Sequence, residues 1–320
     1  MEVLIYHPVL RSPEAVLVDA PRLEQLGFDG LVMPDHLYVL DFQSGVPLPY
    51  PHPLPVLAAA AAVTKRVKLL ALVSNNLARG PVELAQQTAT LANLAPGRAE
   101  LAIGAGWFEA EHVAAGVGFP TGRERIARLE ETVSICRALF TTGQVDHVGA
   151  HYQVQMPPGG FIDVASTIPI MVGAAARHML RAAARVADRV DLQPDALSGG
   201  GADLRAYNSY TFELLAAGVR DVREAAAAVG RDVPVSASPF VLVTADDAEG
   251  GAERNSMADF LGVGVDVIDA SYGTLIGSPR EVGDKLARYV EAGCDRVHLQ
   301  CLNAEAAERV APLLPRLQGL

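Results

Sequence analysis

The sequence predicts an α/β fold, a (β/α)8 barrel that forms one domain over residues 1–320 and carries insertions at its C-terminal face. One unit recurs along the chain: an alanine- and leucine-rich helical segment, a glycine or acidic breaker, a short apolar run and a polar loop. Eight apolar runs fit this unit, and 320 residues match a barrel of typical size plus about seventy inserted residues. An open doubly wound sheet is the alternative, but its first unit should carry a nucleotide fingerprint, which is missing here.

The joint between helix and strand is clearest near the two ends of the chain. Gly27 precedes the apolar run 30–33, and Gly293 precedes the run 296–299 in the same way. Glycine is favoured where a helix ends in a left-handed residue, and the loops from helix to strand in such folds are short. Both passages therefore predict a helix, a tight turn and a buried strand.

The remaining elements follow the same pattern. The eight strands are expected within Val3–Tyr6, Gly30–Met33, Lys65–Val73, Ala95–Ile103, Ile168–Val172, Asp188–Leu192, Val235–Val243 and Arg296–Leu299. Helices are expected between most of them, for example over 82–94, 123–140 and 174–187, and Ser278 with Pro279 has the pattern of a helix start. Long loops occupy 35–55, 141–167 (with a hairpin near 151–154), 193–209 and 245–272 (with a short helix near 257–261). Such loops are expected to cover a pocket at the C-terminal ends of the strands.

Charge and cysteine content exclude several classes of partner. The formal net charge of -11 argues against nucleic acid and against an anionic membrane surface. The three cysteines show no paired spacing and are expected to be reduced thiols. Charged residues near the N-terminus interrupt any signal peptide, and no apolar run is long enough to span a bilayer. We therefore expect a cytoplasmic protein whose partner is a small-molecule substrate.

The stretch that follows the fourth expected strand is the most informative. The run Leu101–Ile103 is continuously apolar, as in a strand covered on both faces. Gly104 and Gly106 then remove Cβ atoms where the chain turns, which permits unusual backbone angles and the close approach of a flat molecule. The pattern is not a dinucleotide fingerprint, because Glu109 occupies the place of the third glycine. From these residues alone, a cofactor loop and an ordinary turn both remain open.

Longer segments resemble the bacterial luciferase-like superfamily, and within it the oxidoreductases that depend on a deazaflavin, coenzyme F420. The resemblance covers most of the chain in the family's order. It is carried by LGFDGLVMPDH at 26–36, IGAGWFEAEHVAAGVGFPTGRERIARLEETVSICRALF at 103–140, PIMVGAAARHMLRAAARVAD at 169–188 and LIGSPREVGDKLARYVEAG at 275–293. It implies a TIM barrel of luciferase-like type whose C-terminal mouth holds a flavin or deazaflavin.

The resemblance also implies which residues bind the cofactor. They follow the second to fifth strands: Asp35, Ala71, Leu72, Gly104, Gly106, Gly173, Ala174 and Ala175. Ala71 and Leu72 match a strand bulge that backs the ring, often through a non-proline cis peptide. Residues 173–175 match the turn that takes the cofactor's phosphate, and an expected helix start after a strand has free amides that favour an anion. The plain alternative for this segment is an ordinary turn between strand and helix.

Two positions depart from the family pattern. Trp107 stands where sugar-phosphate dehydrogenases of the family carry a catalytic glutamate, and Leu40 stands where a tryptophan is expected. The departures predict a more apolar substrate, in a pocket that includes Trp107, Leu40 and Tyr50. A large aromatic after paired glycines suits a wall for a flat ligand, and it equally suits plain core packing.

His36 and Glu111 are the expected catalytic residues. By resemblance, His36 matches a histidine beside the reactive ring carbon, and a neutral imidazole near pH 7 can deliver or accept a proton. Its alternative is a loop histidine that is hydrogen-bonded to a carbonyl. Glu111 matches a position that is commonly acidic in the family, although an acid near a helix N-terminus is also favoured by the helix dipole alone.

The sequence thus predicts an oxidoreductase that moves a hydride between coenzyme F420 and a small organic substrate, as a reductase or dehydrogenase. Dimers are common among relatives, so a homodimer is expected. One alternative is an FMN-dependent monooxygenase, and another is a flavin-fold protein that binds its cofactor without catalysis. A metal-dependent barrel hydrolase is disfavoured, because the first strand ends in a single histidine, His7, and no metal site is expected.

Overall fold

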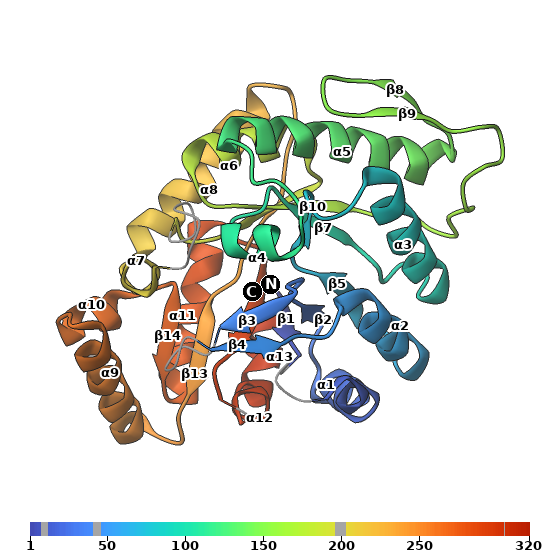
Figure 1. Ribbon diagram of the computed structural model, residues 1–320. Coiled ribbons are helices and arrows are strands. Elements are labelled where there is room, and N and C mark those ends of the chain that lie inside the picture. Colours follow the sequence, from blue (N-terminus) through green and yellow to red (C-terminus); the bar gives the residue numbers. More distant parts are fainter. Residues whose placement is uncertain (8–11, 41–45, 196–202, 304) are drawn as a thin grey trace.

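The computed structural model confirms a parallel barrel with helices on its outside (Figure 1). It describes residues 1–320 apart from 8–11, 41–45, 196–202 and 304. The principal sheet follows the order β5, β2, β1, β15, β12, β11, β10, β7, β6. Only Leu72 and Val73 separate β5 from β6, so the order returns to the stretch of chain where it began. This is the ring that the repeated unit predicts.

All eight expected strands are present, with two differences. The strands of the principal sheet are β1 (Glu2–Tyr6), β2 (Gly30–Met33), β5 (Lys68–Ala71), β6 (Ser74–Asn75), β7 (Leu101–Gly104), β10 (Ile170–Ala174), β11 (Arg189–Leu192), β12 (Val235–Ala237), β13 (Phe240–Val243), β14 (Thr274–Gly277) and β15 (Arg296–Cys301). The seventh expected strand is split into β12 and β13 at Ser238 and Pro239, because proline lacks the amide that a strand ladder needs. The sequence analysis missed β14, which pairs with β13 beside the ring.

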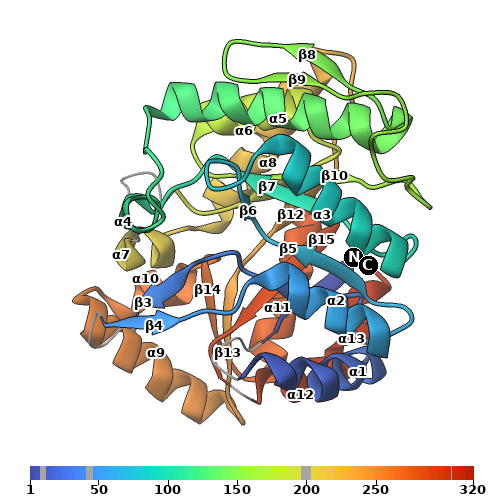
Figure 2. The same ribbon diagram turned by 45° about the vertical axis from the view of Figure 1, so that its right-hand side comes forward.

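Two hairpins project from the barrel. One pairs β3 (Tyr38–Leu40) with β4 (Pro47–Pro49), and the other pairs β8 (Asp146–Val148) with β9 (Gln153–Gln155). The second is the hairpin expected in the loop 141–167, and it lies beyond α5 in both ribbon views (Figures 1 and 2).

The helices are α1 (Val16–Leu26), α2 (Pro53–Val63), α3 (Pro81–Leu94), α4 (Glu109–Ala114), α5 (Gly122–Thr142), α6 (Arg177–Val186), α7 (Leu204–Asn208), α8 (Phe212–Ala227), α9 (Asp247–Leu261), α10 (Val265–Ala270), α11 (Pro279–Ala292), α12 (Ala306–Val310) and α13 (Leu314–Gln318), with single 3-10 turns at Pro13–Ala15 and Ala311–Leu313. The helix expected near 257–261 begins ten residues earlier, because the Asp246 side chain accepts a hydrogen bond from the Glu249 amide at 2.9 Å and caps it. α6 begins at Arg177 rather than at 174, because β10 continues through Ala174.

The expected turn chemistry is confirmed at the joints. Gly27 and Gly293 end α1 and α11 in the left-handed conformation, each with φ of 100°. Ser278 caps α11, its hydroxyl accepting from the Glu281 amide while the Glu281 carboxylate accepts from the Ser278 amide.

The barrel interior has an apolar half and a polar half. Leu4, Val32, Leu70, Ala102 and Met171, from β1, β2, β5, β7 and β10, form one buried apolar cluster. On the opposite strands, β11, β12 and β15, the buried side chains include Asp191, Ser236 and His298. The polar half therefore needs internal hydrogen bonds to be stable.

The elements inserted after the strands gather at one end of the barrel. The β8 and β9 hairpin instead stands before a strand, between α5 and β10, and its loop bonds to the end of α3, so the expectation that the loop 141–167 covers the C-terminal pocket is wrong. In Figure 2, β3, β4, α4, α7 and α10 lie on the left, and the two chain ends lie together on the right. The left side is the C-terminal end of the strands, which we call the mouth. Among the described residues, no helix is both long enough and apolar enough to cross a membrane.

Candidate functional site

A histidine and a glutamate from two different loops meet at the mouth. His36 follows β2, and Glu111 lies on α4 with its side chain 5% exposed. His36 Nδ1 lies 3.1 Å from Glu111 Oε2, and the Leu37 amide donates to Glu111 Oε1. Because an ionised carboxylate only accepts, His36 Nδ1 carries the proton and Nε2 is the nitrogen left for exchange with a ligand. The structure thus brings the two expected catalytic residues together.

Aromatic side chains surround the His36 ring. Trp107 meets it edge-on at 5.7 Å between ring centroids, and Tyr50 does so at 6.4 Å. Trp107 also stacks on Phe108, with centroids 5.2 Å apart and planes 19° apart. Burial raises the pKa of Tyr50 far above its ordinary value, so its hydroxyl stays protonated. Two of the three expected pocket residues therefore flank His36; the third, Leu40, ends β3, and its side chain lies outside the described part of the structure.

Asp35 is engaged by the protein itself. Both terminal nitrogens of Arg79 contact its carboxylate, one of them at 2.8 Å, and the Asn75 amide donates to it at 3.2 Å. Arg79 in turn lies 2.8 Å from His52 Nε2. Asp35 therefore joins the loop after β2 to the loop after β6, and its contact with a cofactor stays a prediction.

The glycines of the expected cofactor bed have partners within the protein. A Cβ on Gly104 would lie 2.6 Å from Val73 Cγ2, and one on Gly173 would lie 2.7 Å from Val73 Cγ1. Gly106 has φ of 80°, and a Cβ there would lie 2.8 Å from His112 Nε2. The sequence interpretation explained Gly104 and Gly106 by the approach of a ligand, whereas the structure shows protein side chains in those spaces. Whether the two glycines also contact a cofactor stays a prediction.

The expected strand bulge lies between β5 and β6. Ala71 and Leu72 are buried, and the Leu72–Val73 peptide bond is cis, as in the family pattern. These residues lie between β2 and β7, at the end of the barrel where His36 and Glu111 meet.

The expected phosphate turn ends β10 and starts α6. Ala174 is buried, and the residue that caps α6, Ala176, makes no side-chain hydrogen bond to the first amides of the helix. These amides and the helix dipole favour an anion at this end. Arg177 is turned to Asp221, with 2.8 Å between the charged groups, so the backbone supplies the attraction at this turn.

A second histidine and carboxylate pair is sealed inside the barrel, and sequence reasoning missed it. His298 Nδ1 lies 3.0 Å from Asp191 Oδ1, and the hydroxyls of Ser236 and Ser238 donate to the same carboxylate at 2.8 Å each. The only sequence signal was polar residues at inward positions of otherwise apolar strands. Burial raises the pKa of Asp191, but His298 and the two hydroxyls outweigh it, so the pKa lies below its ordinary value. Burial lowers the pKa of His298, which stays neutral.

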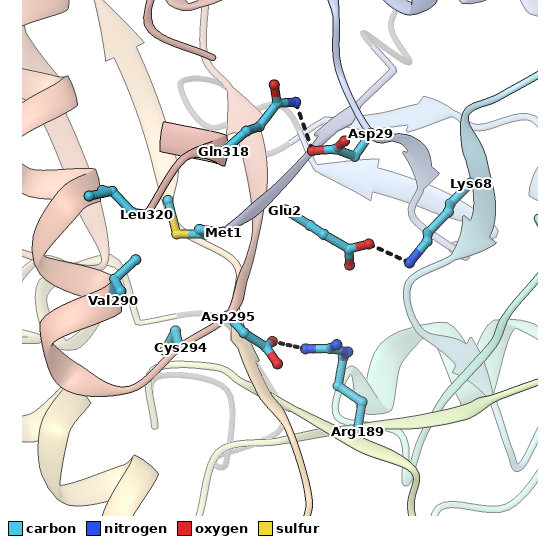
Figure 3. A pocket seen from close by; sticks show the side chains of 10 residues that line it. All are labelled: Met1, Glu2, Asp29, Lys68, Arg189, Val290, Cys294, Asp295, Gln318 and Leu320. Atoms are coloured by element: carbon cyan, nitrogen blue, oxygen red, sulfur yellow. Dashed lines mark hydrogen bonds and ion pairs between the residues drawn. The ribbon is translucent and has the colours of Figure 1, made fainter. Parts of the chain in front are cut away.

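A cavity of about 450 Å³ opens at the end of the barrel opposite the mouth (Figure 3). Its charged groups are paired with one another: Lys68 contacts Glu2 at 2.6 Å, and Arg189 contacts Asp295. Paired charges at the N-terminal end of barrel strands indicate a structural role. Among the described residues, no group of three or more histidine, cysteine, aspartate or glutamate side chains is arranged to hold a metal, and His7 lies 3.2 Å from Asp19.

Comparison with known proteins shows what the chain as a whole is similar to. The sequence model of the family described as luciferase-like monooxygenase matches residues 11–264. An F420-dependent glucose-6-phosphate dehydrogenase of Segniliparus rotundus is 32% identical over 222 residues, which cover 69% of this chain and 61% of that protein. The enzyme of the same name from Nocardia farcinica is 33% identical over 230 residues, covering 69% and 62%. The chain thus spans about three fifths of the length of these relatives.

Solved structures share the fold. An F420-dependent secondary alcohol dehydrogenase in complex with an F420-acetone adduct superposes with a TM-score of 0.77 at 18% identity, covering 99% of both chains. Long-chain alkane monooxygenase superposes with a TM-score of 0.76 at 19% identity, covering 100% of this chain and 92% of the other. At these identities the likeness concerns the fold, and it confirms a barrel of luciferase-like type.

Proposed function

The chain belongs to the luciferase-like monooxygenase family, and on this basis we propose that it is an F420-dependent oxidoreductase that moves a hydride between the coenzyme and a small organic substrate. The observation that carries the proposal is the His36 and Glu111 pair at the mouth, 3.1 Å apart and flanked by aromatic rings. The names of the relatives from Segniliparus rotundus and Nocardia farcinica support F420 as the cofactor.

The residues at the mouth fit a flat ring with a phosphate-bearing tail. The uncapped start of α6, after Gly173, Ala174 and Ala175, would hold the phosphate through backbone amides. Asp35, Ala71, Leu72, Gly104 and Gly106 surround the ends of three neighbouring strands and would form the bed of the ring. When bound, the coenzyme supplies the hydride chemistry, and the protein supplies position and electrostatics.

The proposed task of His36 is to move a proton. When a hydride joins or leaves a carbon that bears oxygen, the oxygen gains or loses a proton in the same reaction. His36 Nε2 would deliver or accept that proton, while Glu111 fixes the opposite nitrogen as a donor and keeps the ring oriented. Trp107 and Tyr50 would limit the access of water to the exchanging nitrogen.

Cofactor titration followed by turnover tests this proposal. The protein is mixed with F420 or with FMN, freed of unbound cofactor by gel filtration and examined by absorbance. We expect F420 to remain with the protein and to change its redox state when an alcohol or ketone substrate is added. Retention of FMN, with oxygen consumed when the bound FMN is reduced, would instead favour a monooxygenase, the function that the family's description and the alkane monooxygenase likeness support. Retention of F420 without turnover on any substrate would favour a binding protein.

We also propose that the protein is a cytoplasmic homodimer. α2 is apolar along its whole length, yet Pro55, Ala62 and Val63 are exposed on it, and an all-apolar helix is normally covered. A second copy would cover that face. Cys136, Cys294 and Cys301 are free thiols, in keeping with a reducing compartment. Sedimentation equilibrium of the wild-type protein and of Val63→Glu tests the dimer, which the variant should weaken.

A further inference from the structure

We infer that the substrate is an uncharged compound with a flat apolar group beside its reacting carbon, and that a phosphorylated sugar is excluded. The inference rests on the proposed function and concerns the same site. It is carried by the aromatic wall beside His36 and by the contacts that already engage Arg79, Arg125 and Arg177.

The wall is formed by stacked rings rather than by isolated ones. Trp107 and Phe108 lie almost parallel, 5.2 Å apart, and Tyr38 meets Phe108 edge-on at 5.6 Å. Because Phe108 and Tyr38 support one side of the arrangement, Trp107 is held in place before any ligand binds. A rigid, half-buried indole beside His36 offers a flat apolar surface to a ligand.

The rim next to the wall is apolar as well. Leu37, which lies between His36 and Tyr38 in the chain, is 52% exposed although its amide is fixed by Glu111. A flat ligand that stacks on Trp107 would cover this leucine, and the burial of both surfaces favours binding. Apart from the indole N–H of Trp107, these surfaces offer no hydrogen-bonding group to the several hydroxyl groups of a sugar, so binding a sugar there would leave polar groups unpaired.

Three of the described arginines around the mouth have partners, whereas Arg205 on α7 is exposed and its side chain makes no hydrogen bond or ion pair with a described residue. Arg79 is held by Asp35 and His52, Arg177 is held by Asp221, and the Arg125 guanidinium lies 4.0 Å from the centre of the Phe119 ring and donates to the Pro120 carbonyl at 2.8 Å. The three lysines of the chain are Lys65, Lys68 and Lys285. Lys65 and Lys68 lie before and at the start of β5, at the opposite end of the barrel, and Lys285 donates to the carbonyls of Asp269 and Ser271.

These contacts indicate a different substrate from that of the relatives, whose names specify glucose 6-phosphate. A phosphate monoester carries nearly two negative charges and is normally held by arginine or lysine. Beside His36 it would instead meet the Glu111 carboxylate, whose partners are the His36 imidazole and one amide. The start of α6 would be occupied by the phosphate of the coenzyme. The mouth therefore favours a neutral substrate.

The chain contains one tryptophan, Trp107, so intrinsic fluorescence reports on this wall directly. We propose titrations of the wild-type protein, with and without F420, using acetophenone, cyclohexyl methyl ketone and glucose 6-phosphate. We expect saturable quenching by acetophenone, at least threefold weaker binding of cyclohexyl methyl ketone, which carries the same carbonyl but is not flat, and no saturable change with glucose 6-phosphate.

Variants separate stacking from general apolar attraction. Trp107→Leu, measured by calorimetry because it has no tryptophan, should raise the Kd of acetophenone roughly five- to tenfold and leave the Kd of F420 within about twofold. Phe260→Leu is the matched control, because Phe260 is an aromatic side chain, 60% exposed, on α9, and it should change neither constant.

Three outcomes decide the matter. Competition of glucose 6-phosphate with acetophenone, or reduction of F420 by glucose 6-phosphate, would overturn the inference. Unchanged acetophenone binding in Trp107→Leu would overturn it as well. A protein that binds acetophenone at Trp107 but never retains F420 would overturn the proposed function and, with it, the assignment of this wall to a substrate. Because cofactor retention is measured by absorbance and substrate binding by fluorescence, these failures are distinguishable.

Discussion

Two of the histidine and carboxylate pairs in the described part of the chain, one at the mouth and one inside the barrel, differ mainly in burial. At the mouth, the side chains of His36 and Glu111 are 22% and 5% exposed, and inside the barrel those of His298 and Asp191 are both fully buried. The distances are nearly equal, 3.1 Å and 3.0 Å. In each pair Nδ1 donates to the carboxylate. Equal geometry therefore does not distinguish a reactive pair from a structural one.

The surroundings make the distinction. Asp191 is fully buried and receives two serine hydroxyls and the Gln193 side-chain amide besides His298, whereas the second oxygen of Glu111 receives the backbone amide of Leu37. The remaining nitrogen of His298 is buried among the described residues without a hydrogen bond, so no substrate can reach it. The interior pair should govern stability and the mouth pair should govern turnover.

Removal of the interior carboxylate should have the largest effect. Asp191→Ala leaves His298, Ser236 and Ser238 without their acceptor and should lower the free energy of unfolding by about 3–5 kcal/mol. Urea denaturation followed by circular dichroism measures this loss. In the same assay, Glu111→Ala should lower the free energy of unfolding by a smaller amount, at least about 1 kcal/mol less than Asp191→Ala does. Equal losses in the two variants would remove the distinction between the pairs.

Removal of the His36 imidazole should have the largest effect on turnover. His36→Ala should lower kcat by roughly a hundredfold or more, equivalent to about 2.7 kcal/mol, because no group remains to exchange the proton. The Kd of F420 should stay near the wild-type value. His151→Ala, in the turn of the β8 and β9 hairpin, is the matched control and should keep full activity. Unchanged kcat in His36→Ala would exclude His36 from the mechanism.

The contrast between the pairs also marks what the sequence could predict. The strands and the joints at Gly27, Gly293 and Ser278 followed from local patterns, because caps and periodicity depend on neighbouring residues. His36 and Glu111 were identified through a family pattern, but their contact joins loops 75 residues apart and needed the structure.

Other features had no local signal. Asp191 lies between Val190 and Leu192 and looks like a charge that interrupts a strand, and only the closure of the ring brings His298 to it. The role of Val73 in filling the space above Gly104 likewise depends on the packing of one strand across another. Sequence reasoning therefore found residues that a family shares and missed contacts created by the barrel.

Neutralising the mouth carboxylate should have an intermediate effect. Glu111→Gln keeps an acceptor for the Leu37 amide but removes the charge that stabilises a protonated His36 ring, so kcat should fall roughly tenfold, equivalent to about 1.4 kcal/mol. Asp191→Asn is the interior counterpart, and its kcat, measured at a temperature where the variant is folded, should stay within about twofold of wild type. A larger fall in the interior variant would show that the sealed pair also serves turnover.

The smallest effect is the response of stability to acid, and it belongs to the interior pair. Burial holds the pKa of His298 below its ordinary value, so below about pH 6.5 the unfolded chain takes up a proton that the native protein does not. The free energy of unfolding should therefore fall with falling pH, with a slope of at most about 1.4 kcal/mol per pH unit from this residue. Asp191, whose pKa is also lowered, adds a further loss of stability at lower pH, near its unfolded pKa of about 3.9.

Urea denaturation between pH 5 and 7.5 tests this prediction. The free energy of unfolding should change less steeply with pH in His298→Gln than in wild type, because the variant no longer binds that proton when it unfolds. If both proteins gave the same slope, the neutral state of His298 inside the barrel would be wrong, and the hydrogen bonds around Asp191 would have to be assigned again.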